Sequence, residues 1–309
     1  MYNYLGDPYT SYLDKDSTDN LMDRLKGEYK GIGVEITTNE SGTVVMTVFE
    51  NSPAEEAGIM VGDIITKVKG VDVNGKTTSE VSNMIKSTNG NVEIEVNRGG
   101  ITKTLTLKVS TVRIKSVIKN KYDKTGYLRI ETFSNTTYKQ FKENLETLEK
   151  DGIENLIVDV RNNGGGFLNS AVEIAELFVE KGKPIYGLQT KDKKEMYKDT
   201  TKEKRDYKVM VLINGGSASA SEVLAAALKE SYGATLLGTK SYGKGTVQDT
   251  SELESGGMIK YTTAYWLTPK GVTINEKGLT PDIEVTGSFK DGMTLENDVE
   301  LQTAINNLK

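Results

Sequence analysis

The sequence contains no histidine and no cysteine among its 309 residues. A Ser-His-Asp triad, a cysteine nucleophile, a histidine-ligated zinc site and a disulfide are therefore excluded. Any general base that works near neutral pH must be a lysine, an aspartate, a glutamate or the α-amine. The absence of cysteine also fits a compartment in which stray thiols would be oxidised.

The chain also lacks a strong net charge and a long apolar run. It has 39 basic and 44 acidic residues and a net charge of −5, so no basic field indicates nucleic-acid binding. No run approaches the roughly 20 apolar residues of a membrane span, and the N-terminus has neither a basic start nor an apolar signal core. The length predicts two domains rather than one.

Residues 31–112 show the pattern of a compact β-rich module. Short strands are separated by Gly-, Asn- and Ser-rich turns, and a hairpin is expected to turn on Gly99 and Gly100. Two helices interrupt the strands, one capped by Ser52 and one over residues 78–87. The second helix is amphipathic, which indicates that one of its faces packs on the strands.

Two segments flank the folded regions. Residues 1–30 are expected to form an N-terminal segment that packs on the larger domain, with a turn at residues 7–9. Residues 287–309 form a polar tail that ends in a short helix. The apolar side of this helix requires a partner surface, and a second subunit is one candidate. The residues on that side are Leu295, Val299 and Ile305.

From residue 113 to 286 the pattern changes to alternating strands and helices. Apolar strands are expected at residues 155–160 and 208–213, and such alternation predicts a mostly parallel sheet covered on both faces by helices. Ligands of these sheets bind outside the carboxyl ends of the strands. Two Gly-rich turns follow the two strands, NNGGG at residues 162–166 and NGGSASASE at residues 214–222. Both turns are therefore predicted at one edge of the sheet.

The second turn carries three serines at alternate positions before a strong helix former. Free N–H groups at the start of that helix would stabilise an oxyanion, which makes Ser219 a candidate nucleophile. The competing interpretation is a capping box, in which Ser219 and Glu222 only satisfy the free amides of the helix. A cap requires neither the preceding glycine pair nor the two further serines.

The stretch SYGKGTVQ places Lys244 between Gly243 and Gly245. Glycine neighbours let a lysine approach another backbone closely, although a glycine-flanked lysine is also a common hairpin tip. The helix and strand after Ser219 return the chain to the same sheet edge. A desolvated Lys244 would have a pKa lowered toward neutrality, so it could replace the missing histidine as general base. Gln248 follows in a strand-like segment and could orient the lysine.

The stretch GTKSYGK also matches the first seven positions of a phosphate-binding P-loop. Gly245 stands where the magnesium-binding serine or threonine belongs, and no helix is expected to follow. Nucleotide binding is therefore disfavoured, and no nucleotide or nucleic-acid partner is expected.

Together these motifs resemble those of the C-terminal processing (tail-specific) serine proteases. The resemblance rests on DVRNNGGG, GSASASE and SYGKGTVQ, and it extends from DPYTSYL to YWLTPKG, GLTPDIEV and LQTAINNL, nearly the whole chain. It implies an α/β protease domain, a mostly parallel sheet flanked by helices, with an inserted or preceding PDZ-like domain. It further implies a serine endopeptidase that recognises and cleaves extended or unfolded proteins near the C-terminus, without metal or cofactor. The alternative is a catalytically latent PDZ peptide-binding scaffold.

The family uses a Ser-Lys dyad assisted by a glutamine, with an oxyanion hole built from two backbone amides. Its site residues match catalytic Ser219, Lys244 and Gln248, and oxyanion-hole Ala220 and Gly165. The family usually has NNPGG, and here Gly164 replaces the proline. The turn is therefore less constrained, and the choice between Gly165 and Gly166 stays open.

The PDZ resemblance implies that a partner's C-terminal strand adds to the edge of the module's sheet, with its carboxylate held by loop amides. The peptide-binding residues it assigns are Gly31, Ile32, Gly33, Val34, Ile36, Val81 and Ile85. In the family an arginine after the helix links substrate occupancy to the protease site. Lys86 stands here instead and cannot make the same planar bidentate contact, which leaves this coupling open.

The resemblance also implies a location and partners. The family acts outside the cytoplasm, typically at the bacterial envelope, so an exported protein whose leader is absent from this chain is expected. The expected partners are the C-terminal tails of substrate proteins, and a homodimer through the terminal segments.

Overall fold

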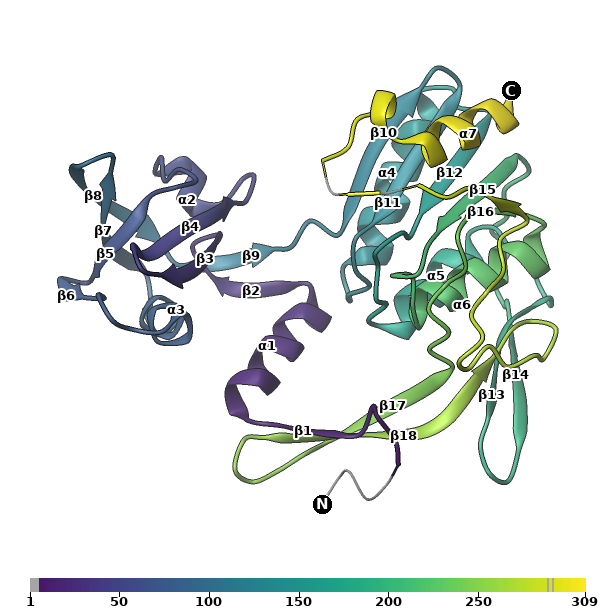
Figure 1. The fold of residues 1–309 in the computed structure, drawn as a ribbon, viewed down its shortest axis with the longest axis horizontal. Helices are drawn as coiled ribbons and strands as arrows, with labels where there is room; N and C mark the ends of the chain where they lie inside the picture. The colour runs from purple at the N-terminus through teal and green to yellow at the C-terminus, as the bar shows by residue number, and fades with distance from the viewer. Residues whose placement is uncertain (1–5, 288, 291) are drawn as a thin grey trace. The chain divides into compact units, whose positions relative to one another are not determined.

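The computed structural model describes residues 6–287, 289–290 and 292–309. The chain divides into two compact units (Figure 1). Glu28–Ile114 form one, here called the inserted unit, and Met1–Gly27 with Lys115–Lys309 form the other, here called the α/β unit. The chain enters and leaves the inserted unit through two antiparallel strands, β2 (Glu28–Gly31) and β9 (Ser110–Arg113).

The inserted unit is an antiparallel sheet with two helices. The strand order is β3 (Val34–Asn39), β4 (Gly42–Val48), β5 (Ile64–Val68), β7 (Asn91–Arg98) and β8 (Ile101–Lys108), with β6 (Val71–Asp72) paired to β5. The hairpin between β7 and β8 turns on Gly99 and Gly100, both at positive φ, as predicted. Strand β3 is an edge strand, so one side of its backbone has no neighbouring strand in the described sheet.

The two helices of the inserted unit are α2 (Pro53–Glu56) and α3 (Thr78–Lys86). Ser52 caps α2, as predicted, and Thr77 forms a capping box with Glu80 at the start of α3. Val81 and Ile85, one helical turn apart, are buried in the core of the unit.

The α/β unit is built on a six-stranded sheet. Its order is β10 (Val117–Tyr122), β11 (Thr125–Ile130), β12 (Asn155–Asp159), β15 (Lys208–Ile213), β16 (Thr235–Gly238) and β19 (Ile283–Glu284). β10 runs antiparallel to β11 and every other pair is parallel, which confirms the predicted mostly parallel sheet.

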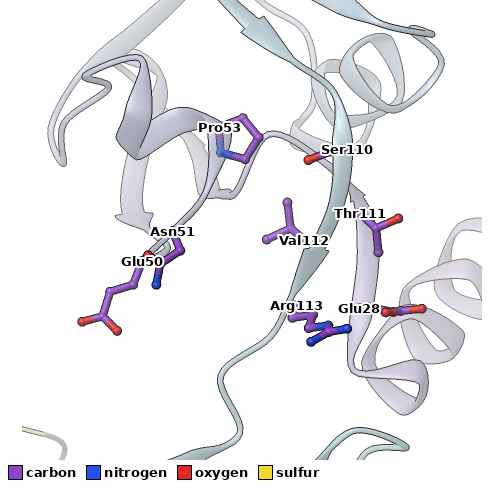
Figure 2. A pocket seen from close by; sticks show the side chains of 8 residues that line it. All are labelled: Glu28, Glu50, Asn51, Pro53, Ser110, Thr111, Val112 and Arg113. Carbon is purple, nitrogen blue, oxygen red and sulfur yellow. The ribbon is translucent and has the colours of Figure 1, made fainter.

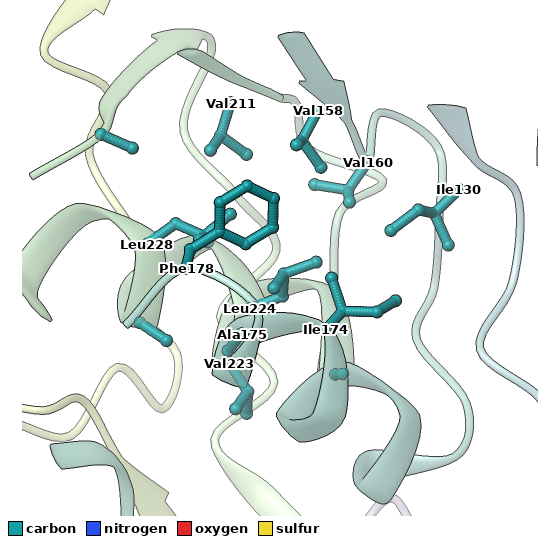
Figure 3. Packing of buried hydrophobic residues seen from close by; sticks show 14 of the residues in the cluster. Ile130, Val158, Val160, Ile174, Ala175, Phe178, Val211, Val223, Leu224 and Leu228 are labelled. Carbon is teal, nitrogen blue, oxygen red and sulfur yellow. The ribbon is translucent and has the colours of Figure 1, made fainter. Parts of the chain in front are cut away.

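Helices cover both faces of this sheet. Alternate residues of a strand face opposite sides, and the strands carry buried apolar residues on both. Figure 3 shows Val158, Val160 and Val211 packing toward the helices of one face. Those helices are α4 (Thr137–Lys150), α5 (Leu168–Glu176) and α6 (Ala220–Ala227), which continues as a π-helical turn over Leu228–Tyr232. Ile157 and Leu212 face the other side, against α7 (Val299–Leu308).

The C-terminal helix therefore finds its partner surface within the chain. Leu301, Ala304 and Ile305 are buried against the sheet, whereas Val299, expected on the apolar side, is 55% exposed. The expected partner surface is therefore the sheet of the same unit, and a homodimer through the terminal segments stays a prediction. None of the helices in the described ranges combines the length and the apolarity needed to span a membrane.

A second, antiparallel sheet of the α/β unit was not predicted. It consists of β1 (Ser11–Leu13), β18 (Met258–Leu267), β13 (Pro184–Gln189) and β14 (Lys194–Lys198), with β17 (Thr246–Glu252) paired to β18. β1 leads into α1 (Lys15–Lys26), which Asp14 caps. In this sheet β18 lies between the N-terminal strand β1 and the strand that follows Lys244, because β1 and β17 pair with its two opposite edges.

Candidate active site

The two Gly-rich turns meet at the carboxyl ends of the parallel strands β12 and β15, as predicted. Asn163 joins them: its carbonyl accepts hydrogen bonds from the Ala218 amide at 3.0 Å and from Ser221 Oγ at 2.8 Å. Its side-chain amide donates to the Ile130 carbonyl at 2.8 Å, and its Oδ1 accepts from the Gly165 amide at 2.9 Å. The turns therefore form one hydrogen-bonded structure rather than two independent loops.

Ser219 lies on a sharp turn between β15 and α6. It is one of few non-glycine residues at positive φ, with φ 55° and ψ −117°. Such backbone strain at a strand-to-helix turn is typical of a nucleophile elbow, where it presents the hydroxyl above the sheet. Ser219 is half-buried, whereas Ala218 and Ala220 on either side are buried.

The Ala220 amide is suited to bind an oxyanion. Ala220 is only 1% exposed, and its N–H donates to no acceptor within the part of the chain that the structure describes. Buried amides are nearly always paired, so an unpaired one beside the predicted nucleophile indicates a ligand position. This is the predicted first donor of the oxyanion hole.

Gly165 rather than Gly166 lies beside Ser219. A Cβ on Gly165 would lie 2.9 Å from Ser219 Cβ and 3.0 Å from the Ala220 nitrogen. A Cβ on Gly166 would lie 2.1 Å from the Phe133 carbonyl oxygen, so that glycine allows the close backbone contact with Phe133 in the loop after β11. The Gly165 amide donates to Asn163 Oδ1, so an oxyanion would compete with that oxygen for the second hydrogen bond.

The loop that carries Lys244 depends on its two glycines. A Cβ on Gly243 would lie 2.7 Å from the Gly278 nitrogen, and one on Gly245 would lie 2.6 Å from Asn275 Cβ. The Lys244 carbonyl accepts from Trp266 Nε1 at 2.7 Å. The glycines therefore allow the close backbone approach that the sequence predicts, and the loop leads into strand β17 rather than a helix, unlike a P-loop.

The Lys244 side chain is half-buried, and its Nζ lies 5.1 Å from the centroid of the Tyr9 ring. Burial lowers the pKa of Lys244 below its usual range, and the positive charge of Lys260 lowers it further, whereas Glu222 opposes the shift. The predicted direction of the pKa shift thus agrees with the structure. Within the described ranges no hydrogen bond joins Lys244 Nζ to Ser219 Oγ.

Glu222 connects the two loops. It is fully buried, and its Oε2 accepts from the Ser219 amide at 2.9 Å and from the Lys244 amide at 3.0 Å. Its Oε1 accepts from Ser241 Oγ at 2.5 Å and from the Gly243 amide at 2.7 Å. Burial raises the pKa of Glu222, although these four donors oppose the shift. One carboxylate thus fixes the backbones of both predicted catalytic residues.

Replacing Glu222 by glutamine is expected to lower kcat by roughly 10- to 100-fold, because misplacing a catalytic group by about 1 Å has effects of this size. The side-chain NH₂ of the glutamine would replace one carboxylate oxygen and leave the donors bound to that oxygen without an acceptor. This loss costs about 1–3 kcal/mol of stability. Rate constants and thermal unfolding of the variant measure both effects. The exposed Glu180→Gln is the control, and a Glu222→Gln enzyme with unchanged kcat would contradict this role.

Gln248 lies on β17 and contacts two threonines. Its Nε2 donates to Thr246 Oγ1 at 2.7 Å and to Thr262 Oγ1 at 3.4 Å. No hydrogen bond within the described residues links it to Lys244. The structure therefore holds Gln248 on the strand that follows the lysine without showing the predicted assistance.

The predicted peptide-binding residues of the inserted unit separate into two groups. Val81 is fully buried and Ile85 is 4% exposed, so both support the core rather than an open pocket. Val34 and Ile36 are half-buried on edge strand β3, beside helix α3. The accessible apolar surface at the β3 edge is therefore provided by Val34 and Ile36 of the strand rather than by Val81 and Ile85 of the helix.

The loop before β3 presents free amides. Ile32 is 2% exposed and Gly33 is buried, yet neither amide donates a hydrogen bond in the described part of the chain. Their carbonyls are occupied, by the Ala54 amide and the Phe49 amide respectively. Two unpaired buried amides next to a free strand edge are suited to hold a carboxylate.

A separate hollow of about 530 Å³ lies on the inserted unit (Figure 2). None of the predicted peptide-binding residues lines it. Its lining consists of Glu28, Glu50, Asn51, Pro53, Ser110, Thr111, Val112 and Arg113.

Three residues beside the predicted site were missed or undervalued. Glu222 was weighed only as a helix cap, although the capping-box spacing was its signal. Tyr9 and Lys260 had no signal of a role at the site, because both approach Lys244 through the unpredicted antiparallel sheet.

The fold and the site define a class of protein: an α/β unit of the serine-peptidase type into which a PDZ domain is inserted. The chain belongs to peptidase family S41, whose sequence model matches residues 124–285. The PDZ domain model matches residues 31–109. The family and fold class predicted from the motifs are thereby confirmed.

Curated relatives are similar over most of the chain. The CtpA-like serine protease of Staphylococcus haemolyticus (strain JCSC1435) is 36% identical over 289 residues, and that of Staphylococcus aureus (strain N315) is 38% identical over 289 residues. Each match covers 92% of this chain and 58% of the relative. The chain thus spans little more than half the length of these relatives.

Two solved structures share the fold. The photosystem II D1 C-terminal processing protease is 31% identical with a TM-score of 0.56, covering 93% of this chain and 80% of that chain. An S41 protease from Bacteroides fragilis NCTC 9343 has a TM-score of 0.59 at 15% identity, covering 98% of this chain and 87% of that chain. The second likeness concerns the fold alone.

Proposed function

We propose that the protein is a serine endopeptidase in which Ser219 is the nucleophile and Lys244 the general base. The observation that carries this proposal is the strained Ser219 turn, next to the unpaired Ala220 amide and tied through Glu222 to the Lys244 backbone. The names of the relatives, CtpA-like serine protease and C-terminal processing protease, support it.

In the proposed mechanism, Ser219 Oγ attacks the scissile carbonyl and neutral Lys244 takes the hydroxyl proton. The Ala220 amide donates to the developing oxyanion, with the Gly165 amide as the second donor once it leaves Asn163. The lysine ammonium then gives its proton to the leaving amine. A water molecule, deprotonated by Lys244, hydrolyses the acyl-enzyme. We propose that Gln248, which lies on β17, orders the segment around Lys244.

The proposed substrates are extended or unfolded proteins that are recognised by their C-terminal ends. The tail would add as a strand to β3, and the Ile32 and Gly33 amides would hold its carboxylate. Half-buried Val34 and Ile36 on this edge favour tails with apolar residues. An extracytoplasmic location is part of the same proposal, and the absence of cysteine fits it.

The proposal is tested with an unfolded protein that ends in apolar residues and with the same protein ending in two aspartates, both in EDTA. We expect the wild type to cleave the apolar-tailed substrate faster, and Ser219→Ala to cleave neither. If the wild type binds the substrate proteins but cleaves neither, the proposed protease activity is contradicted and a latent PDZ scaffold is favoured. Equal cleavage of the two substrates would overturn the proposed tail recognition alone.

A further inference from the structure

The turn near the N-terminus touches the proposed base. Tyr9 is half-buried, and its ring lies 5.1 Å from Lys244 Nζ, within the distance of a cation–π contact. The proposed mechanism gives Tyr9 no part. The ring nevertheless contacts Lys244, the residue that receives the serine proton in the proposed mechanism.

The backbone is held in place on both sides of Tyr9. Asp7 Oδ1 accepts from the Tyr9 amide at 3.0 Å, and its Oδ2 accepts from Thr10 Oγ1 at 2.5 Å, which fixes the backbone of the turn. Tyr242, two residues before Lys244, contributes to the raised pKa of the Tyr9 phenol. The following strand β1 pairs with β18. The backbone that carries the ring is therefore fixed on both sides of Tyr9.

Charged and titratable groups approach Lys244 from several elements. Lys260 of β18 and Glu222 of α6 act on it with opposite signs, and the Tyr9 phenol stays neutral because burial raises its pKa. Tyr242 and Glu276 act on Tyr9 in turn. Within this set, the Tyr9 ring is the neighbour that both fills space and contacts the ammonium without a charge of its own.

We propose that Tyr9 is a positioning residue for the general base, whose ring confines the Lys244 side-chain nitrogen and excludes water from one side of it. This inference rests on the proposed function. A lysine side chain has four rotatable carbons and a strongly hydrated head, so it needs a surface to restrict it. The ring supplies that surface, since its face lies against the side-chain nitrogen and fills space that water would otherwise occupy.

A purely structural role of Tyr9 and a role in positioning Lys244 predict different effects of its replacement. If the ring only fills space, its loss reduces stability and the fraction of folded enzyme, while each folded molecule keeps its kcat and its pH profile. If the ring restricts and shields Lys244, its loss lowers kcat in molecules that remain folded. It also moves the acidic limb of the pH profile to higher pH. Burial is the largest cause of the lowered pKa of Lys244, so we expect the lost shielding from water to outweigh the lost attraction between ring and ammonium, which acts in the opposite direction.

The first experiment compares Tyr9→Phe, Tyr9→Leu and Tyr9→Ala in the full chain, with kcat, KM and melting temperature measured across pH. We expect Tyr9→Phe to retain most of kcat because it keeps the ring. Tyr9→Ala should lose on the order of 10- to 100-fold in kcat with little change in KM, and its acidic limb should move to higher pH. Tyr9→Leu should keep the limb closer to that of the wild type because it still excludes water.

A charge variant separates shielding from electrostatics. Lys260→Gln removes a positive charge near Lys244, so it should also move the acidic limb to higher pH while the ring stays in place. Tyr9→Ala with a wild-type kcat and limb would overturn the inference. Equal losses in Tyr9→Phe and Tyr9→Ala would overturn it too, because they would assign the effect to the hydroxyl and Tyr242.

The second experiment needs no catalysis. In a Ser219→Ala background, competitive acetylation at several pH values followed by mass spectrometry measures the titration of Lys244, with exposed Lys240 as internal control. We expect Tyr9→Ala to raise the pKa of Lys244 and leave Lys240 unchanged. Identical Lys244 titration with and without the ring would contradict the inference. If Lys244 shifts in this background but the protein with Ser219 intact cleaves no substrate, the proposed function is rejected and the effect of the ring on Lys244 is established.

Discussion

Replacing Lys244 by methionine is expected to lower kcat on the order of 10⁴-fold or more, since removing one member of a nucleophile–base pair costs about as much as removing the pair. Methionine keeps the length and the apolar stem of the lysine but cannot accept a proton. The Lys244 backbone, held by Glu222 and Trp266, is unaffected by the change of side chain. Affinity for a C-terminal tail peptide should therefore stay at the wild-type value while turnover is lost.

The matched control is Lys240→Met, four positions earlier in the same loop, because Lys240 is exposed. It should keep wild-type kcat. Steady-state rates with an unfolded substrate, together with tail-peptide affinity, distinguish the two variants. A Lys244→Met enzyme that retains even a tenth of wild-type kcat would show that the base is another residue, and Lys260, the nearby lysine, would be the next to test.

The central features of the site could be predicted because they follow from local rules. Parallel strands bring their carboxyl ends to one edge, so the turns after β12 and β15 had to meet there. The glycines around Lys244 predicted a close backbone approach, which the contacts of Gly243 and Gly245 confirm. The missing histidine left lysine, aspartate, glutamate and the α-amine as possible bases, and the glycines beside Lys244 favoured that lysine. Each of these inferences needed only a few neighbouring residues.

The residues that were missed depend on long-range pairing. β1 and β17 both pair with β18, and no local pattern reveals which distant strands become neighbours. This pairing places Tyr9 and Lys260 near Lys244. Glu222 was visible as a cap, but its contacts with the Lys244 loop come from the return of the chain after β16. Its second function therefore could not be read from spacing alone.

A buried ionic cluster at the end of β12 anchors the C-terminal helix to the site. The Arg161 side chain is fully buried and donates to Asp159 at 2.6 Å, to Asp298 at 2.7 Å and to Glu300 at 2.7 Å. The Phe289 ring lies 3.9 Å from the guanidinium carbon. Burial would lower the pKa of Arg161, but these acids raise it above its usual value, so the residue stays charged. Arg161 directly precedes the turn that leads to Gly165.

Replacing Arg161 by methionine is expected to destabilise the protein by about 3–5 kcal/mol at neutral pH, because it leaves three acids buried without a cation. Chemical unfolding of the variant measures the loss. Lys124→Met is the control: Lys124 pairs with Glu154, but both side chains are more than half exposed, so little change is expected. Wild-type stability of Arg161→Met would show that the acids need no cation.

The pH dependence of this loss provides a second check. Burial already raises the pKa of Glu300 above its usual value despite Arg161, and removal of the guanidinium raises it further. An acid whose folded-state pKa exceeds its unfolded value binds its proton more tightly when folded, so its ionisation destabilises the fold as pH rises between the two values. Acid should therefore restore part of the stability of Arg161→Met as pH falls from neutral through the raised pKa of Glu300. A deficit that stays the same on acidification would assign the destabilisation to lost packing against Phe289 rather than to uncompensated charge.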